Sequence, residues 1–260
     1  MKLLLIALSA LLLVPNFINV HPGKIPEHFK KDKFDPKLAY INSIEKLISV
    51  SDSIARSKNI PETSFGYALT VSHLLVNRFY HGYSRYPVNE NWIAATAEHL
   101  FGYGLASIVK PDDILKYNFG ACSQQAIVFT EVMKVKKIPF RSVSFPHHYA
   151  TELKYNNNWY FFDTNLEPDI TDSGRLETAW HHNIENLKQY YNKSNHNIDW
   201  FFGFDKAKFG DVNAKPAANI SMFHTTTNYL SKTLWLFPLF FVFYRRKVKS
   251  NRTKYFTPLD

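Results

Sequence analysis

Residues 119–165, FGACSQQAIVFTEVMKVKKIPFRSVSFPHHYATELKYNNNWYFFDTN, decide the fold because the hydrophobic period changes within them. Up to Lys137 the apolar residues recur at helical spacing without a breaker, which predicts a helix that starts at Cys122 and ends at Ile138-Pro139. Beyond Pro139, three short runs are rich in β-branched and aromatic residues and are separated by PHH and NNN. We interpret FRSVSF, HYATELKY and NWYFFDT as three sequential antiparallel strands.

The segments before this stretch are helical in pattern. Three amphipathic runs, 36–59, 62–83 and 91–109, predict three helices that form a subdomain N-terminal to the cysteine. A further helix is predicted within 177–193, whereas 199–221 is aromatic and irregular. The sequence therefore predicts one α+β domain over residues 37–215, with an N-terminal helical subdomain and a helix packed on an antiparallel sheet.

Both ends of the chain carry apolar runs. Residues 1–20 have the layout of a secretory signal, and an uncleaved N-terminal anchor remains the alternative. Residues 21–36 are interpreted as a linker. Residues 229–244 are a candidate transmembrane or interfacial segment, although the apolar run within them is shorter than the roughly 20 residues that a span requires. The basic tail 245–260 then predicts an extracytoplasmic, membrane-associated body, on the periplasmic or cell-surface side, with a cytoplasmic tail.

The net charge of +9 is concentrated at the C-terminal end, where 245–260 is strongly basic. The body carries no basic stripe, so its surface is not that expected for nucleic-acid binding. The tail's charge is better explained by membrane topology or by anionic lipid. We therefore expect the membrane as a partner and no nucleic acid.

Cys122 is the only cysteine, so the chain has no intrachain disulfide. The thiol is then a packing residue, an intermolecular link or a reactive group. Its predicted place at a helix N-terminus favours a thiolate, because unpaired N–H groups and the helix dipole stabilise an anion there. The small residues Gly120 and Ala121 would let a substrate carbonyl approach, and the Cys122 N–H would supply half of an oxyanion hole.

Two further residues complete a candidate triad. His148 starts the second predicted strand, and Asp163 ends the third. In an antiparallel meander these two positions are neighbours across the NNN turn, on the edge that faces the start of the helix. Cys122, His148 and Asp163 are therefore the candidate nucleophile, base and orienting acid.

The motifs Gly120-Ala121-Cys122, Ile138-Pro139-Phe140-Arg141, His148 with Glu152, and Trp159 with Asp163 resemble the core of the transglutaminase-like superfamily. The resemblance covers about 45 residues, in order and at compatible spacing. It implies a papain-like α+β fold that uses Cys122, His148 and Asp163, with no metal and no organic cofactor. The sequence departs from the pattern at Lys137, where glycine is usual, and at Ala121, where aspartate is common.

The oxyanion residue that this resemblance implies is not identified by a motif. The candidates for the oxyanion site or the cleft are Tyr117, Asn118, Gln124 and Trp92. Histidines 147, 181 and 182 lack metal-ligand spacing and are interpreted as surface or core residues. Arg141 is expected to pair with a carboxylate under the strands, and Trp159 to pack in the core.

The sequence supports more than one function. The first is thioester-mediated acyl chemistry on protein or peptide amides, by hydrolysis or by transfer to an amine. The alternative is a catalytically silent scaffold or binding module at the membrane. A third interpretation, a small-molecule or polysaccharide binder, rests only on the aromatic residues Trp200, Phe201, Phe202 and Phe204.

Overall fold

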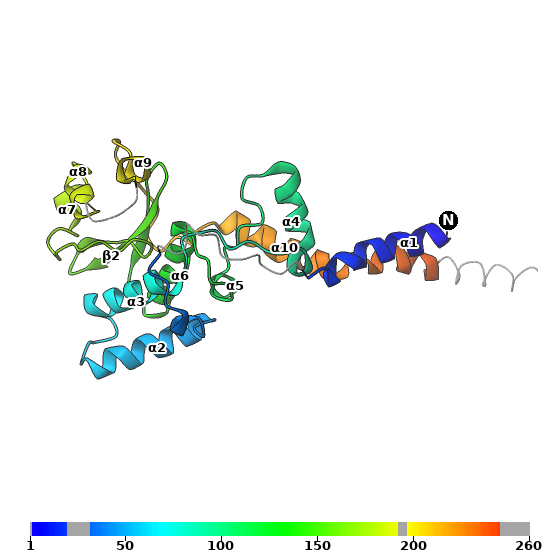
Figure 1. Cartoon of the computed structure of the whole chain (residues 1–260), viewed down its shortest axis with the longest axis horizontal. Helices are drawn as coiled ribbons and strands as arrows, with labels where there is room; N and C mark the ends of the chain where they lie inside the picture. Colours follow the sequence, from blue (N-terminus) through cyan, green and yellow to red (C-terminus); the bar gives the residue numbers. More distant parts are fainter. Residues whose placement is uncertain (1, 20–31, 192–196, 245–260) are drawn as a thin grey trace, which may run out of the picture. The chain divides into compact units, whose positions relative to one another are not determined.

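A computed structural model describes residues 2–19, 32–191 and 197–244 of the chain. It is an α+β protein with one four-stranded antiparallel sheet in the order β3-β2-β1-β4 (Figure 1). The chain forms two compact units. Unit 1 comprises 1–24, 85–107 and 219–260, and unit 2 comprises 25–84 and 108–218. The predicted tail and most of the predicted linker lie outside the described residues.

The sheet of unit 2 confirms the three predicted strands. β1 is Phe140–Ser144, β2 is Tyr149–Tyr155 and β3 is Asn158–Phe162, and each pairs antiparallel with the next. Asn156 and Asn157 form the turn between β2 and β3 with φ of 48° and 65°, a left-handed conformation that asparagine tolerates. The prediction missed β4, Lys208–Phe209, because two residues give no periodic signal.

One face of the sheet is covered by α6, which runs Cys122–Val135 as predicted and packs on β1 and β2. The helices α2, Ile44–Ser57, and α3, Phe65–Arg78, pack against α6 in turn, and the short α5 is Pro111–Leu115. Serine N-caps fix both starts: Ser43 accepts from Lys46 N at 3.1 Å and Ser64 accepts from Tyr67 N at 3.3 Å. A short 3-10 turn, η3, occupies Pro36–Leu38.

The other face of the sheet carries short helices rather than the single helix predicted over 177–193. They are α7, Glu177–Trp180; α8, Glu185–Lys188; η4, Gln189–Tyr191; and, further along, α9, Ile198–Phe202. The break follows Trp180, because Asn183 Oδ1 accepts a hydrogen bond from Glu185 N at 3.1 Å and starts a new helix. The buried core on this face includes Val143, Phe145, Ala150, Phe161, Trp180, Leu187, Tyr191 and Phe202.

Unit 1 is helical. It contains α1, Lys2–Leu13; η1, Val14–Phe17; α4, Val88–Phe101; and α10, Ala218–Thr233, followed by helical residues 236–244. The predicted helix over 91–109 therefore starts earlier and ends sooner, since Gly102, at φ 70°, lies just past its last residue. Over the described parts of the chain, no helix combines the length and the apolar character needed to cross a membrane.

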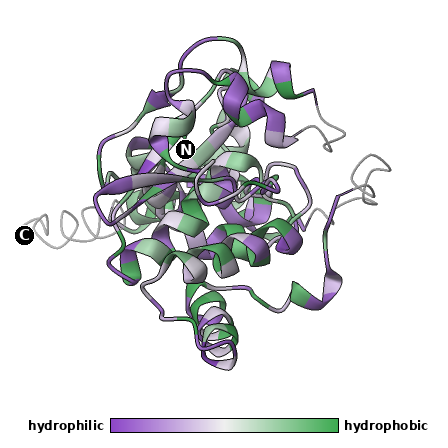
Figure 2. Ribbon diagram, turned by 90° about the vertical axis from the view of Figure 1, so that its left-hand side faces the viewer, coloured by the Kyte–Doolittle hydropathy of each residue, from purple (hydrophilic) through white to green (hydrophobic). Residues whose placement is uncertain are grey.

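The hydropathy of the residues alternates along the elements of unit 2 (Figure 2). Its helices and strands each show hydrophobic and hydrophilic segments, as expected for elements with one face on a core. This amphipathic pattern brings α6 against one face of the sheet and α7 to α9 against the other. The ends of β2 and β3 then lie near the start of α6, where the candidate site forms.

Candidate active site

Cys122 is the first residue of α6 and is half-buried. The buried Gln124 side chain fixes this helix start, because its Oε1 accepts from the backbone N–H of Ala121 at 3.2 Å and of Ser84 at 2.9 Å. The N–H of Cys122 has no acceptor one turn earlier within the helix, as holds for any first turn. A thiol at this point lies beside the positive end of the helix dipole.

Gly120 has a packing role that differs from the expected one. A Cβ at Gly120 would lie 2.9 Å from the Phe79 ring and 3.2 Å from Gln125 Cγ. The glycine is therefore required by the close approach of Phe79, a contact between residues distant in sequence. The small size of Gly120 makes room for the Phe79 ring and not for a substrate.

His148 and Asp163 meet in the interior of unit 2. His148 Nε2 lies 2.8 Å from Asp163 Oδ2, and both side chains are almost fully buried. Burial alone would lower the pKa of His148, but the charge of Asp163, followed by the interaction with Cys122, raises it to about 10. Because Nε2 is taken by Asp163, Nδ1 is the ring nitrogen left for the thiol, and it is buried without a hydrogen-bond partner among the described residues. Asp163 thus pairs with His148, and Cys122 lies on the same pocket as His148.

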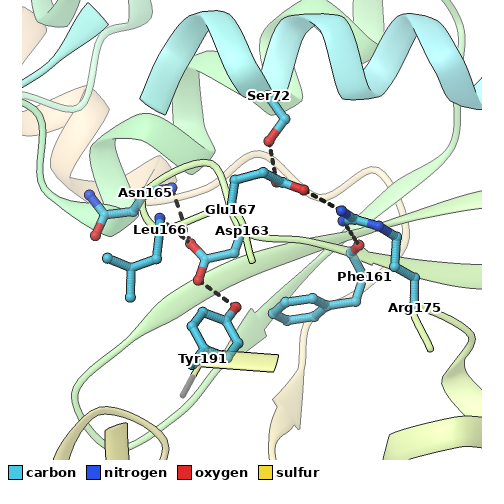
Figure 3. A network of polar contacts seen from close by, with 8 residues as sticks. All are labelled: Ser72, Phe161, Asp163, Asn165, Leu166, Glu167, Arg175 and Tyr191. Atoms are coloured by element: carbon cyan, nitrogen blue, oxygen red, sulfur yellow. Dashed lines mark hydrogen bonds and ion pairs between the residues drawn. The ribbon is translucent and has the colours of Figure 1, made fainter. Parts of the chain in front are cut away.

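The Asp163 carboxylate is surrounded by donors. Tyr191 Oη donates to Oδ2 at 2.7 Å, and the backbone N–H groups of Asn165 and Leu166 donate to Oδ1, both at 3.1 Å (Figure 3). Burial raises the pKa of this carboxyl group, but His148 and these hydrogen bonds outweigh burial, so the pKa lies below its ordinary value. Asp163 is therefore held as a carboxylate that accepts and does not donate.

The turn that follows Asp163 is anchored by a buried ion pair. Glu167 pairs with Arg175 and also accepts from Ser72 Oγ, while Arg175 Nη1 donates to Phe161 O at 2.9 Å (Figure 3). Glu167 has a φ of 25°, in the left-handed region, and its N–H donates to Asp163 O at 2.7 Å. Burial raises the pKa of Glu167 despite the charge of Arg175. The network fixes the turn that carries the two N–H donors to Asp163.

A pocket of about 630 Å³ lies over Cys122 and His148. Its walls come from five segments that are distant in sequence: the α3–α4 connection, the start of α6, the connection from β1 to β2, the turn after β3, and α9. The lining residues outside the triad include His81, Gly82, Tyr83, Tyr149, Trp200 and Phe201. A volume of this size suits a side chain and its flanking backbone or a small molecule.

Asn165 also lines the pocket and is 6% exposed. Its Nδ2 is buried and has no hydrogen-bond partner among the described residues. A buried amide without a partner costs free energy unless a ligand or water satisfies it. Asn165 is therefore the clearest candidate for a hydrogen-bond donor to a bound group. It follows Asp163 by two positions, but the sequence gives no motif that singles it out.

The four residues proposed from sequence for the oxyanion site or the cleft do not line the pocket. The Gln124 amide is used by backbone groups, since Nε2 donates to Ser84 O at 2.9 Å and to Ile108 O at 2.8 Å. Asn118 Oδ1 accepts from Arg78 Nη1 at 3.3 Å. Tyr117 follows α5, and Trp92 belongs to unit 1, where its Nε1 donates to Ser231 O at 3.0 Å.

Arg141 and Glu152 support the sheet rather than the pocket. Arg141 Nη2 lies 2.7 Å from the fully buried Glu152, whose other oxygen is 2.7 Å from His181 Nε2. The Arg141 guanidinium also lies 4.3 Å from the centre of the Trp159 ring, an arrangement typical of a cation–π contact. The expected structural role of Arg141 matches this geometry, and Trp159 is buried as expected.

The aromatic segment of α9 is divided between core and pocket. Phe202 is fully buried, whereas Trp200 is 53% exposed and stacks on His147 with ring centroids 4.1 Å apart. Phe201 lines the pocket and lies 5.5 Å from the His148 ring. Sequence reasoning missed Tyr191 as a partner of Asp163, because a tyrosine in a broken helix carries no signal of its target.

Among residues 2–19, 32–191 and 197–244 no group of three or more His, Cys, Asp or Glu side chains is arranged to hold a metal ion. Comparison of the chain with protein-family models, with curated proteins and with solved structures gave no match. A half-buried thiol and an imidazole at one pocket, with a carboxylate paired to the imidazole, can perform nucleophilic chemistry on a carbonyl group.

Proposed function

We propose that this protein is a thiol-dependent enzyme of the transglutaminase-like superfamily, with a papain-like core, that acts on amide carbonyls of proteins or peptides. One observation carries the proposal: Cys122 starts a helix beside His148, which lies 2.8 Å from Asp163, at a pocket of about 630 Å³. The motif resemblance supports it independently, because the same three residues occupy its nucleophile, base and acid positions. No cofactor is needed for this chemistry.

In the first step the Cys122 thiolate attacks the amide carbonyl carbon and forms a C–S bond. The His148 imidazolium then donates its proton to the amide nitrogen, the C–N bond breaks, and the amine or ammonia leaves. The acyl group remains on Cys122 as a thioester. Asp163 stabilises the charged imidazole throughout, in agreement with the raised pKa of His148.

In the second step an acceptor attacks the thioester, and neutral His148 takes the proton that the acceptor loses. The C–S bond breaks and the thiolate is restored, so no oxidant or reductant is required. Water as acceptor gives a carboxylic acid, and an amine gives a new amide. The pocket is open to both, so the acceptor defines whether the enzyme is a hydrolase or a transferase.

Two donors would stabilise the oxyanion of the tetrahedral intermediate. One is the Cys122 N–H at the start of α6. The other is Asn165 Nδ2, which is buried at the pocket and has no partner among the described residues. Removal of one such donor typically lowers kcat about 10²–10³-fold. Asn165→Ala is thus expected to slow acyl transfer and to leave alkylation of Cys122 unchanged.

The first test is iodoacetamide labelling of Cys122 in the full-length protein from pH 5 to 9. We expect fast labelling near neutral pH that is lost in His148→Ala, because a thiolate is stabilised by the adjacent imidazolium. His182→Ala is the matched control, since His182 is an exposed histidine of the same unit. Slow labelling that is equal in all three proteins would overturn the proposal and favour a silent scaffold.

The second test measures the reaction itself. Full-length protein is incubated with casein in the presence of dansylcadaverine, and incorporation of the amine is followed together with ammonia release. Incorporation that is abolished by Cys122→Ser identifies a transferase, and ammonia or new N-termini without incorporation identify a hydrolase. Fast labelling without any of these products would contradict action on protein amides.

A further inference from the structure

The helices at the two ends of the chain form an antiparallel pair within unit 1. We call residues 2–17 and 229–244 the terminal helix pair. Ser9 Oγ donates to Trp235 O, and Asn16 Nδ2 donates to Ser231 O at 3.0 Å. Lys232 Nζ in turn donates to Asn16 Oδ1 at 3.0 Å. Ser9 contacts residue 235, whereas Asn16, further along the chain, contacts the earlier residue 231, so the two segments run antiparallel. Figure 1 shows α1 beside the C-terminal helix.

In the terminal helix pair, Ser9 and Ser231 are buried and most of the apolar side chains are exposed, although Pro238 and Val242 are buried as well. Ser9 is the one polar side chain between Leu3 and Leu13, and it is 4% exposed. The leucines of the same helix are turned outward, with Leu3 83% and Leu11 69% exposed. The exposed apolar residues of α1 cover more than half of its circumference. They are Leu3, Leu4, Ile6, Leu8 and Leu11.

The second helix of the pair repeats this inversion. Apolar and aromatic residues are exposed along 229–244, namely Tyr229, Leu230, Leu236, Phe237, Phe240, Phe241, Phe243 and Tyr244. The buried residues of α10 itself are polar: Ser221, His224, Thr227 and Ser231. Asn91 Nδ2 donates to Thr227 Oγ1 at 2.9 Å, and His224 Nε2 lies 2.8 Å from Leu105 O. Hydrogen bonds therefore join the 85–107 segment of unit 1 to α10.

A helix in water buries its apolar face, and a helix that is apolar all round is either enclosed by protein or surrounded by lipid. Hydrogen bonds between helices, with small or polar residues at the contact, are typical of packing within a bilayer, where hydrocarbon takes the place of water. Apolar residues that are exposed singly are normal on a protein surface, but here they recur along both helices of the pair. Hydrocarbon is therefore the solvent that fits this surface.

The basic residues near one end of the pair indicate what covers its apolar surface. Because the helices are antiparallel, Lys2 and residue 244 lie at the same end, and the sequence continues from there as RRKVKS. Basic residues next to an apolar helix end bind anionic lipid headgroups. A second copy of the chain would not require basic residues directly after residue 244 in the sequence, so the charge favours the bilayer as the occupant.

We propose that the terminal helix pair is a lipid-embedded anchor, and that α1 is a retained half of this anchor rather than a leader removed during export. α1 is about 18 Å long, enough to reach through the hydrocarbon of one leaflet of a core about 30 Å thick. The inference goes beyond the proposed chemistry, and it does not depend on the reactivity of Cys122.

The first experiment is flotation of the full-length protein with vesicles of phosphatidylcholine and phosphatidylglycerol after removal of detergent. Wild type is expected to float. The Leu4→Asp, Leu11→Asp variant is expected to bind the vesicles at least about 50-fold more weakly, because an aspartate buried in a bilayer is unfavourable. Val212→Asp is the matched control, since Val212 is an exposed apolar residue of unit 2. Equal iodoacetamide labelling of Cys122 in all variants shows that unit 2 is intact.

Three outcomes of flotation would contradict the proposal. One is wild-type protein that stays at the bottom of the gradient as a soluble monomer. The other is a stable soluble dimer, which would assign the apolar surface to a second copy of the chain. Floating of the double-aspartate variant as efficiently as wild type would also exclude α1 from the anchor.

The second experiment tests retention and pairing of α1. In a Cys122→Ser background, Ser9→Cys with Trp235→Cys is expected to form a disulfide in vesicles, because the Ser9 hydroxyl contacts Trp235 O. Ser9→Cys with Met222→Cys is the control, because Met222 lies about 20 Å further along the helix. The intact mass of protein isolated from membranes is expected to include α1. A mass that lacks residues 1–19, or equal cross-linking in both pairs, would overturn the proposal.

Discussion

Units 1 and 2 differ in what they bury. The core of unit 2 is made of large apolar side chains such as Phe161, Trp180 and Phe202, and it also holds the buried pairs His148–Asp163 and Glu167–Arg175. In unit 1 the buried positions of α10 are polar, and leucine and phenylalanine side chains are exposed. The same chain thus follows two opposite rules. Burial alone does not identify a core, because the surrounding solvent decides which side chains are turned inward.

The largest effect is expected from pH in unit 2. The His148 pKa rises from 6.5 to about 10 in the folded protein, and a tenfold change in proton affinity corresponds to about 1.4 kcal/mol. A raised pKa stabilises the fold below pH 6.5 and ceases to do so as pH rises through 10. The Asp163 pKa is lowered, so its contribution is present above its ordinary pKa of 3.8 and is lost in stronger acid.

This pH dependence is measured by urea unfolding of the full-length protein in detergent micelles, in a Trp92→Phe and Trp235→Phe background whose remaining tryptophans, Trp159, Trp180 and Trp200, belong to unit 2. His148→Gln is expected to flatten the alkaline decline, and the exposed His182→Gln is expected to leave it unchanged. If both variants decline like wild type, the buried imidazolium does not stabilise unit 2.

The second prediction compares two phenylalanines. Phe161 is fully buried between β-sheet and helices, with ring contacts to Phe145 at 6.3 Å and Trp180 at 5.3 Å. Phe161→Ala is expected to destabilise unit 2 by about 3–5 kcal/mol, because it leaves a cavity. Phe240→Ala, at 63% exposure in unit 1, is expected to change unfolding in micelles by less than about 0.5 kcal/mol. Similar losses would remove the contrast between the units.

The third prediction concerns Tyr191, whose hydroxyl lies 2.7 Å from Asp163 Oδ2. Tyr191→Phe is expected to cost about 2 kcal/mol, since a hydrogen bond to a charged group is lost in the interior. It should also move the acid limb of Cys122 labelling to higher pH, because this bond helps to lower the Asp163 pKa. Tyr190→Phe is the neighbouring control. A loss of stability without a change in the labelling profile would assign Tyr191 a packing role.

The smallest effect is expected for a polar contact in unit 1. Thr227→Val removes the hydrogen bond from Asn91 but keeps the shape of the side chain. In vesicles the cost is expected to be about 0.6 kcal/mol, the average for hydrogen bonds between helices in membranes. The exposed Thr226→Val is the control. Unfolding in vesicles and proteolysis of the 85–107 segment report the result, and a loss above about 3 kcal/mol would indicate an aqueous, tightly packed unit.

The sequence predicted those features that depend on local patterns. The helix start at Cys122, the three strands and the asparagine turn follow from periodicity and turn chemistry, and they suffice to bring Asp163 beside His148. Features that depend on contacts between distant segments were not predictable. These include the association of 85–107 with the chain ends, the role of Tyr191, and the use of Gln124 to fix the helix start.

The stack of Trp200 on His147 gives the pocket a built-in optical reporter. The two rings are nearly parallel, at an interplanar angle of 2°, and both residues line the pocket. A ligand that covers the exposed face of the indole or separates it from the imidazole would change the emission of Trp200. Binding at this wall of the pocket can then be titrated without a label and without turnover, even in a Cys122→Ser variant.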